Sequence, residues 1–159
     1  MLPEFAGRAI RVEIRRSLGP HLAASSIPRR VILLDAEVLR STGDFERILF
    51  HEIFHFAWTR CSNATRLSWE QLLESELRAG VRGELGWSSE WRKARLTRRD
   101  RSRRTPRWRR YVCESFCDSA AWLFAGLARH AEFTLPAVWR RRRKACFRRI
   151  FPASAPIPI

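Results

Sequence analysis

The chain has 159 residues, of which 45% are hydrophobic and 30% are charged, and its formal net charge is +15. A chain of this length and composition can bury a hydrophobic core as one domain, so global disorder is excluded. It has no run of about 18 apolar residues that could span a membrane, and residues 1–18 lack the apolar block of a secretory signal. We expect a cytoplasmic protein with one domain over residues 1–150 and a proline-rich, loose tail at 151–159.

The first part of the chain predicts short strands followed by a buried helix. Residues 5–18 fit either a strand or a helix, because their apolar positions match both spacings. The apolar run at 31–34 predicts a strand. Residues from about 44 to 59 predict a helix, with Thr42 or Asp44 as its N-cap. Apolar side chains surround that helix almost completely, which is typical of a buried helix.

The rest of the chain predicts further helices separated by loops. Ser68 opens the capping-box pattern Ser-Trp-Glu-Gln, and Gly80 is a plausible end for the helix that would follow. A short helix is expected from residue 87, an exposed loop over 97–107, and a long helix from about 108 to 130.

The positive charge is concentrated in two segments of an otherwise near-neutral chain. Residues 92–110, which we interpret as a basic insertion, carry eleven basic residues and one acidic residue, and residues 140–149 carry seven basic residues. Such segments could meet nucleic acid, an acidic partner or an anionic surface, or form solvated surface. Trp91 and Trp108 flank the insertion and could stack on bases. The candidate anion-binding residues are Arg98, Arg99, Arg101, Arg103 and Arg104.

The predicted buried helix contains His51-Glu52-Ile53-Phe54-His55, which is the pattern H-E-x-x-H. Residues four apart lie on one face of a helix, so both imidazoles can bind one metal ion. The glutamate beside them can take a proton from water. Burying these polar groups without a partner would be costly, and a metal is a suitable partner. The motif predicts a Zn²⁺ site with Glu52 as general base; the alternative is a pair of hydrogen-bonded core histidines.

A catalytic zinc usually has three protein ligands, so a third ligand is expected elsewhere in the chain. Cys61 lies ten residues after the first histidine, where the metzincin pattern has its third ligand, but Trp58 stands where that pattern needs glycine. Glu114, on the second long predicted helix, is the better candidate. Cys113 and Cys117 lie one helical turn apart and are expected to pack, with metal or redox roles as the alternative.

With Glu114-Ser-Phe-Cys-Asp118 following H-E-x-x-H, the sequence resembles the gluzincin class of zinc metallopeptidases. Members of that class carry a glutamate ligand on a helix after the H-E-x-x-H helix. An acidic residue four positions later often hydrogen-bonds a zinc-bound histidine. The resemblance implies a zincin-like α+β domain, with a small sheet packed on the two helices and Asp118 orienting one imidazole. The ligands that it implies for one Zn²⁺ are His51, His55 and Glu114.

The resemblance also implies roles outside the metal ligands. The strand at 31–34 would match the edge strand along which gluzincins lay their substrate. Tyr111 and His130 are the candidates by residue type for the Tyr or His that stabilises the oxyanion in many members, although each also suits a structural role. The separation of 59 residues between His55 and Glu114 is longer than in compact members, because the basic insertion lies between them.

The predicted function is therefore that of a hydrolase, a zinc metallopeptidase that acts on a peptide or protein substrate. One alternative is a basic nucleic-acid-binding protein whose zinc is structural. Another is a zincin-like pseudoenzyme that keeps its metal and serves as an interaction module. The presence of Glu52 favours the enzyme, because a structural zinc has no use for a carboxylate beside an open coordination position.

Overall fold

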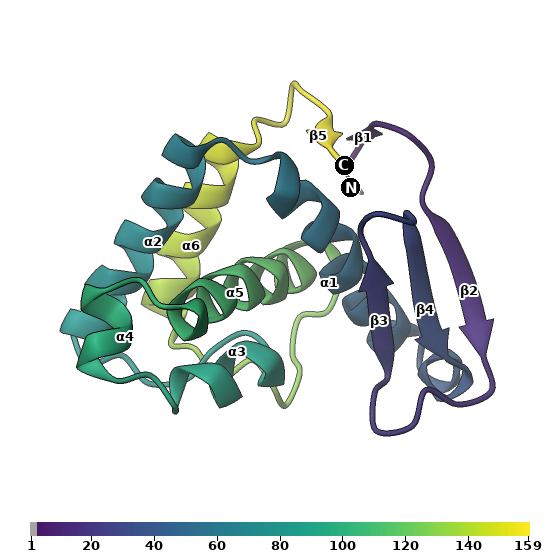
Figure 1. The fold of residues 1–159 in the computed structure, drawn as a ribbon, viewed down its shortest axis with the longest axis horizontal. Helices are drawn as coiled ribbons and strands as arrows, with labels where there is room; N and C mark the ends of the chain where they lie inside the picture. The colour runs from purple at the N-terminus through teal and green to yellow at the C-terminus, as the bar shows by residue number, and fades with distance from the viewer. Residues whose placement is uncertain (1–2) are drawn as a thin grey trace.

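The computed structural model describes residues 3–159, which form an α+β fold with six α-helices and a small sheet (Figure 1). The three-stranded sheet lies beside α1, and the other helices lie on the opposite side of α1. The strands are β1 (Phe5–Ala6), β2 (Arg11–Arg15), β3 (Ala23–Ser26), β4 (Val31–Asp35) and β5 (Ile157–Pro158). The helices are α1 (Thr42–Arg60), α2 (Asn63–Arg78), α3 (Trp87–Lys93), α4 (Arg98–Ser102), α5 (Pro106–Phe124) and α6 (Ala137–Ile150), with a 3-10 helix η1 (Ala36–Arg40) before α1.

The central strand of the sheet is β4, so the strand predicted at 31–34 is confirmed but its expected position is wrong. β2 pairs with β4 in parallel, with Glu13 opposite Leu33, and β3 pairs with it antiparallel, with Ala24 opposite Leu33. Because both edges of β4 are already hydrogen-bonded, it cannot receive a substrate strand. The strand order β2-β4-β3 leaves the outer edge of β3 free within the described chain. The strand alternative for residues 5–18 is also confirmed, by β1 and β2.

Helix α1 is buried from two sides, as its apolar pattern predicts. Ile48 and Phe56 pack with sheet residues in one hydrophobic cluster. Phe50 and Phe54 belong to a second cluster, which contains α5 and α6 residues and is rich in aromatic rings. The ring of Phe54 stacks on Phe124 at a centroid distance of 5.4 Å. Full burial of each such side chain stabilises the fold by about 1.5–3 kcal/mol, so the core fixes α1 between the sheet and α5.

Helix boundaries differ from the predictions where capping residues lie earlier in the chain. Ser41 caps α1 by accepting a hydrogen bond from the Asp44 backbone at 3.3 Å. Ser62 caps α2, so the capping-box pattern at Ser68 lies inside a helix. Trp69 of that pattern is fully buried in the aromatic core, which shows that core packing outweighs the local capping signal here.

The segment 97–107, expected to be a loop, contains the short helix α4 and the start of α5. Thr97 and Asp100 form a capping box at α4, and hydrogen bonds from Thr105 and Thr97 lower the pKa of Asp100 to about 2. Pro106 occupies the first turn of α5, where its missing N–H costs nothing. The helix ends at Phe124 instead of near residue 130.

The proline-rich C-terminal segment differs from the expected loose tail, because its last residues pair with the N-terminal strand. β5 pairs with β1 in parallel, with Ile157 opposite Phe5. Ile157 is buried in the aromatic core, and both ends of the described chain therefore lie close together (Figure 1). No helix among residues 3–159 has both the length and the apolar character that crossing a membrane requires.

A buried ion network joins α6 to the centre of the molecule. Arg143 is fully buried and donates to Glu76 at 2.6 Å and 2.9 Å, and to Glu84 at 2.6 Å. Glu84 also accepts from the Tyr111 hydroxyl at 2.7 Å and forms an ion pair with Lys93 at 3.2 Å. Burial opposes ionisation of Glu84, but Arg143 and Lys93 keep its pKa below the ordinary value. Arg143 belongs to the basic segment 140–149 in the sequence, but in the fold it is a core residue.

Candidate metal centre

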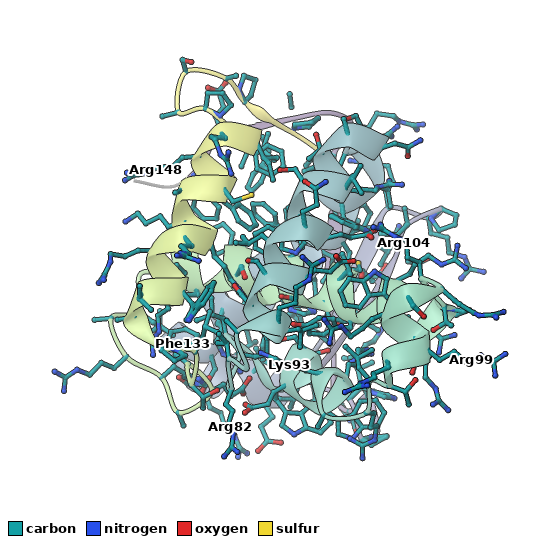
Figure 2. The ribbon with its side chains drawn as sticks, turned by 90° about the vertical axis from the view of Figure 1, so that its left-hand side faces the viewer. Arg82, Lys93, Arg99, Arg104, Phe133 and Arg148 are labelled. Atoms are coloured by element: carbon teal, nitrogen blue, oxygen red, sulfur yellow. The ribbon has the colours of Figure 1, made fainter. Side chains whose placement is uncertain are left out.

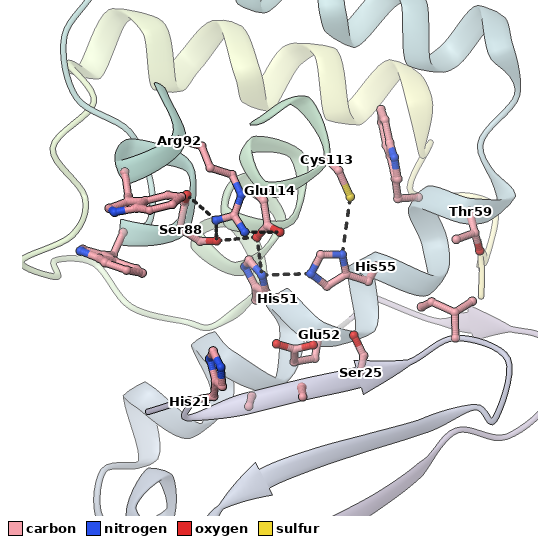
Figure 3. A pocket seen from close by; sticks show the side chains of 16 residues that line it. His21, Ser25, His51, Glu52, His55, Thr59, Ser88, Arg92, Cys113 and Glu114 are labelled. Carbon is pink, nitrogen blue, oxygen red and sulfur yellow. Dashed lines mark hydrogen bonds and ion pairs between the residues drawn. The ribbon is translucent and has the colours of Figure 1, made fainter. Parts of the chain in front are cut away.

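The two histidines of H-E-x-x-H converge at the wall of an open cleft (Figure 3). They lie one turn apart on α1, and the Nε2 atoms of His51 and His55 are 3.2 Å apart. Their imidazoles lie between α5 on one side and β3 on the other. The rigid packing of α1 in the core holds both rings in place.

Glu114 on α5 is the carboxylate that faces His51 from the neighbouring helix. Its Oε2 lies 3.3 Å from Nε2 of His51. Burial alone would raise the pKa of Glu114, but a hydrogen bond and positive charge from His51, with a smaller contribution from His55, lower it to about 2. The carboxylate is therefore ionised and available as a ligand at neutral pH.

Asp118, one turn after Glu114, fixes the orientation of His51. Its Oδ1 lies 2.7 Å from Nδ1 of His51, and its Oδ2 accepts from the Ser89 backbone at 3.0 Å. Because Nδ1 donates to this carboxylate, Nε2 is the ring nitrogen that faces His55 and Glu114, and in the neutral imidazole it carries the lone pair. Gly86 is required beside this contact, because a Cβ there would lie 2.2 Å from Cγ of Asp118. Sequence reasoning placed Asp118 in this role, and the structure brings it to that position.

The two separations that His51 makes with His55 and Glu114 fit a divalent metal ion. Ligand atoms bound at about 2.1 Å in a tetrahedron lie about 3.4 Å from one another, close to the 3.2 Å and 3.3 Å separations that His51 makes with His55 and Glu114. If both imidazoles are neutral with their lone pairs facing each other at this distance, they repel unless a proton or a metal ion lies between them. Burial disfavours the charged form of His51, yet Asp118 and Glu114 raise its pKa well above the ordinary value. The electrostatic field at this position therefore favours positive charge.

Glu52 lies on α1 with the two histidines and forms with them a group that could itself hold a metal ion. One carboxylate oxygen is within 4.8 Å of the imidazole nitrogens of His51 and His55. Glu52 is 8% exposed, and it points from the imidazoles toward β3 (Figure 3). No group among residues 3–159 makes a hydrogen bond with it, so its oxygens are free to contact a molecule in the cleft.

The cleft has a volume of about 690 Å³ and lies between β3 and α3. Small side chains of β3 form one wall. The α3 wall is fixed to the Glu114 carboxylate, because Ser88 donates to Glu114 at 2.5 Å and Arg92 lies 3.4 Å from it. The residues that line the cleft include His21, Ala23, Ala24, Ser25, Ile27, Trp58 and Thr59, and on α3 Trp87, Ser88, Trp91 and Arg92.

Sequence reasoning missed the contribution of α3 to this cleft. Trp87 and Trp91 are 63% and 42% exposed, and their ring centroids are 6.1 Å apart. Both line the cleft, although only Trp91 was singled out, and for stacking on bases. The spacing Trp-x-x-x-Trp-Arg, which puts two tryptophans on one helix face, is the signal that could have indicated them.

Several candidate residues lie away from the cleft. The Tyr111 hydroxyl is buried against Glu84, so the structure does not bring it to the site. The Nε2 atom of His130 instead lies 3.1 Å from Oδ1 of Asp44, within hydrogen-bond distance. Cys61 follows the end of α1 and lines a separate hollow with C-terminal residues; burial raises its pKa to about 11. These positions exclude all three from contact with a metal held by His51.

The basic insertion is also separate from the cleft, apart from its first residue. Trp108 is fully buried and donates from Nε1 to Glu70, so it cannot stack on bases. Arg104 pairs with Glu70 and Glu74. The other named arginines, Arg98, Arg99, Arg101 and Arg103, lie on α4 or at its end and do not line the cleft.

A second group of potential metal ligands shares His55 with the first. The thiol of Cys113 lies 3.5 Å from Nδ1 of His55, and Cys117 lies close to both. Hydrogen bonds from Cys117 and His55 lower the pKa of Cys113 to about 6. Since Nδ1 and Nε2 point to different partners, the thiols can orient His55 while its Nε2 faces His51.

The described residues can thus hold a metal ion at the wall of a cleft. Comparisons of the chain with protein-family models, with curated proteins and with solved structures find no match.

Proposed function

We propose that the chain is a zinc-dependent metallopeptidase with a zincin-like fold of gluzincin type. The observation that carries this proposal is the contact of His51 with both His55 and Glu114 at an open cleft, with a Glu52 oxygen within 4.8 Å of both imidazoles. Two imidazoles and one carboxylate are the ligand set of catalytic zinc sites that keep an open position. A closed structural site would instead have four protein ligands and no adjoining cleft.

His51, His55 and Glu114 would hold the Zn²⁺. When bound, the ion would supply Lewis-acid chemistry, polarising a carbonyl group and lowering the pKa of water to about 7. Asp118 and the Cys113 thiol would keep the two imidazoles oriented, each through the ring nitrogen that does not face the metal.

Proton transfer is the role that the position of Glu52 supports. Its carboxylate would accept a proton from the attacking water and return it to the leaving amine. Arg92 is the arginine that lines the cleft, and Ser88 holds its guanidinium through hydrogen bonds of 2.8 Å and 2.9 Å. It is placed to donate to the carbonyl oxygen as negative charge develops there, the role for which sequence reasoning suggested Tyr111 or His130.

An extended peptide is the substrate that the cleft walls favour. The free edge of β3 offers backbone N–H and C=O groups that a peptide strand can pair with. Across the cleft, Trp87 and Trp91 expose aromatic surface that a large apolar side chain of the peptide could cover. The substrate would then lie between β3 and α3, with its backbone passing Glu52.

Metal dependence of peptide hydrolysis tests this proposal. We expect the protein to cleave an unfolded protein such as casein, with fragments identified by mass spectrometry. A chelator should abolish cleavage, and added Zn²⁺ should restore it, because Glu52 alone cannot activate water sufficiently at neutral pH. Cleavage that persists in full after removal of the metal would contradict the proposal.

A further inference from the structure

We propose that the exposed face of α6 binds the phosphodiester backbone of a nucleic acid. Five side chains form this basic face, and they are Arg141, Arg142, Lys144, Arg148 and Arg149. This inference is independent of the metal centre, because none of the five lines the cleft between β3 and α3.

Helical geometry places all five cations on one side of α6. At 100° per residue they occupy an arc of about 160°, which also contains Ala137, Val138 and Ala145 of α6. The buried side of the same helix carries Cys146 and Phe147 in the aromatic core. The fold therefore places five of the cations of residues 140–149 on an outer face of α6, whereas the inner face of the helix packs in the core.

The cations of the basic face have no acidic partners within the described chain. α6 contains no Asp or Glu, and its ion pairs there are those of the buried Arg143. Those two ion pairs anchor α6 to Glu76 and Glu84, so the helix presents its outer cations from a fixed position. Five like charges on adjacent turns repel one another, and a bound polyanion would relieve that repulsion.

The density of charge points to phosphodiesters. Arg141 and Arg149 are separated by about 12 Å along the helix axis, a length over which duplex DNA carries about seven negative charges. Four of the five cations are arginines, whose guanidinium groups match phosphate oxygens in bidentate geometry. A membrane surface would need large apolar side chains among the cations. On α6 one exposed large apolar side chain is present, Val138 at 47%, and it precedes all five cations.

The same side of the molecule carries a second group of outward-pointing arginines. In Figure 2, Arg148 on α6 points outward at one edge of this side, and Arg99 on α4 points outward at the other. Between them lies α2, whose Glu74 already pairs with Arg78 and Arg104. Because the Glu74 carboxylate is already paired with these arginines, it is not free to repel a nucleic acid that extends from the basic face toward α4.

Fluorescence anisotropy with a labelled DNA duplex, and separately with a single-stranded RNA, tests the proposal. Five phosphate contacts predict that log K falls with log[salt] with a slope of about −4.5, a loss of about 500-fold between about 50 and about 200 mM salt. The variant Arg141→Gln/Arg148→Gln/Arg149→Gln removes three exposed cations. It should lower the magnitude of the slope by about 2.7 and keep the melting temperature of the wild type.

The matched control is Arg8→Gln/Arg16→Gln/Arg29→Gln, which removes the same charge from exposed positions around the sheet. It should keep the slope of the wild type. Equal losses in the two variants would overturn the proposal, because they would show a response to net charge alone. Tighter binding to phosphatidylserine vesicles or to polyglutamate than to either nucleic acid, in the same salt, would also overturn it.

Discussion

Replacement of Glu52 by Gln should lower peptide hydrolysis by about 10²–10⁴-fold while the protein keeps its zinc. The amide has nearly the shape of the carboxylate but cannot accept a proton from water. In the proposed site Glu52 acts as the base and not as a ligand, so metal binding should persist. The measurement is the rate of casein cleavage alongside zinc per chain for the same preparation.

Glu46→Gln is the matched control, because Glu46 lies on the same helix but does not line the cleft. It should hydrolyse casein at the rate of the wild type. If Glu52→Gln cleaved as fast as this control, Glu52 would not be the base, and the proposed catalytic role of H-E-x-x-H would be wrong.

Replacement of Arg143 by Ala should destabilise the fold by about 3–5 kcal/mol, because it leaves buried carboxylates without their cation. Arg143 is fully buried and makes two contacts with Glu76 and one with Glu84. The free energy of unfolding, measured by urea denaturation at pH 7, gives the loss directly. The contribution of Glu84 is present above its ordinary pKa of 4.5 and is lost as the pH falls, because folding lowers that pKa.

Arg141→Ala provides the comparison on the outer face of the same helix. Arg141 is exposed, so its replacement should change the free energy of unfolding by about 0.5 kcal/mol or less. Similar small effects in both variants would show that the ion network joining α6 to Glu76 and Glu84 does not hold the helix in place.

The part of the site that could be predicted from sequence is the part set by local helix geometry. His51, Glu52 and His55 share one helix, so their spacing alone brings them together. Glu114 and Asp118 could be named only through the resemblance to gluzincins, because the local sequence does not indicate which surface of α1 their helix packs against. The structure supplies that information through the packing of α1 on α5.

Residues that act through long-range contacts could not be predicted. The β3 sequence Ala-Ala-Ser-Ser lacks the alternation of a half-buried strand, so the free edge beside the metal centre gave no signal. Arg143 resembles its exposed neighbours in a basic run, and the acids it meets lie 59 and 67 residues away. Gly86 has an ordinary extended backbone, and only its contact with Asp118 explains why it must be glycine.

The most direct test of the metal centre is zinc per chain, measured by mass spectrometry on tag-free protein after zinc loading and desalting. The wild type should contain about one zinc ion. Glu114→Ala should contain much less, because it removes one of three ligands, whereas Glu90→Ala on neighbouring α3 should match the wild type. Absence of zinc from the loaded wild type, or full retention in Glu114→Ala, would contradict a site built from His51, His55 and Glu114.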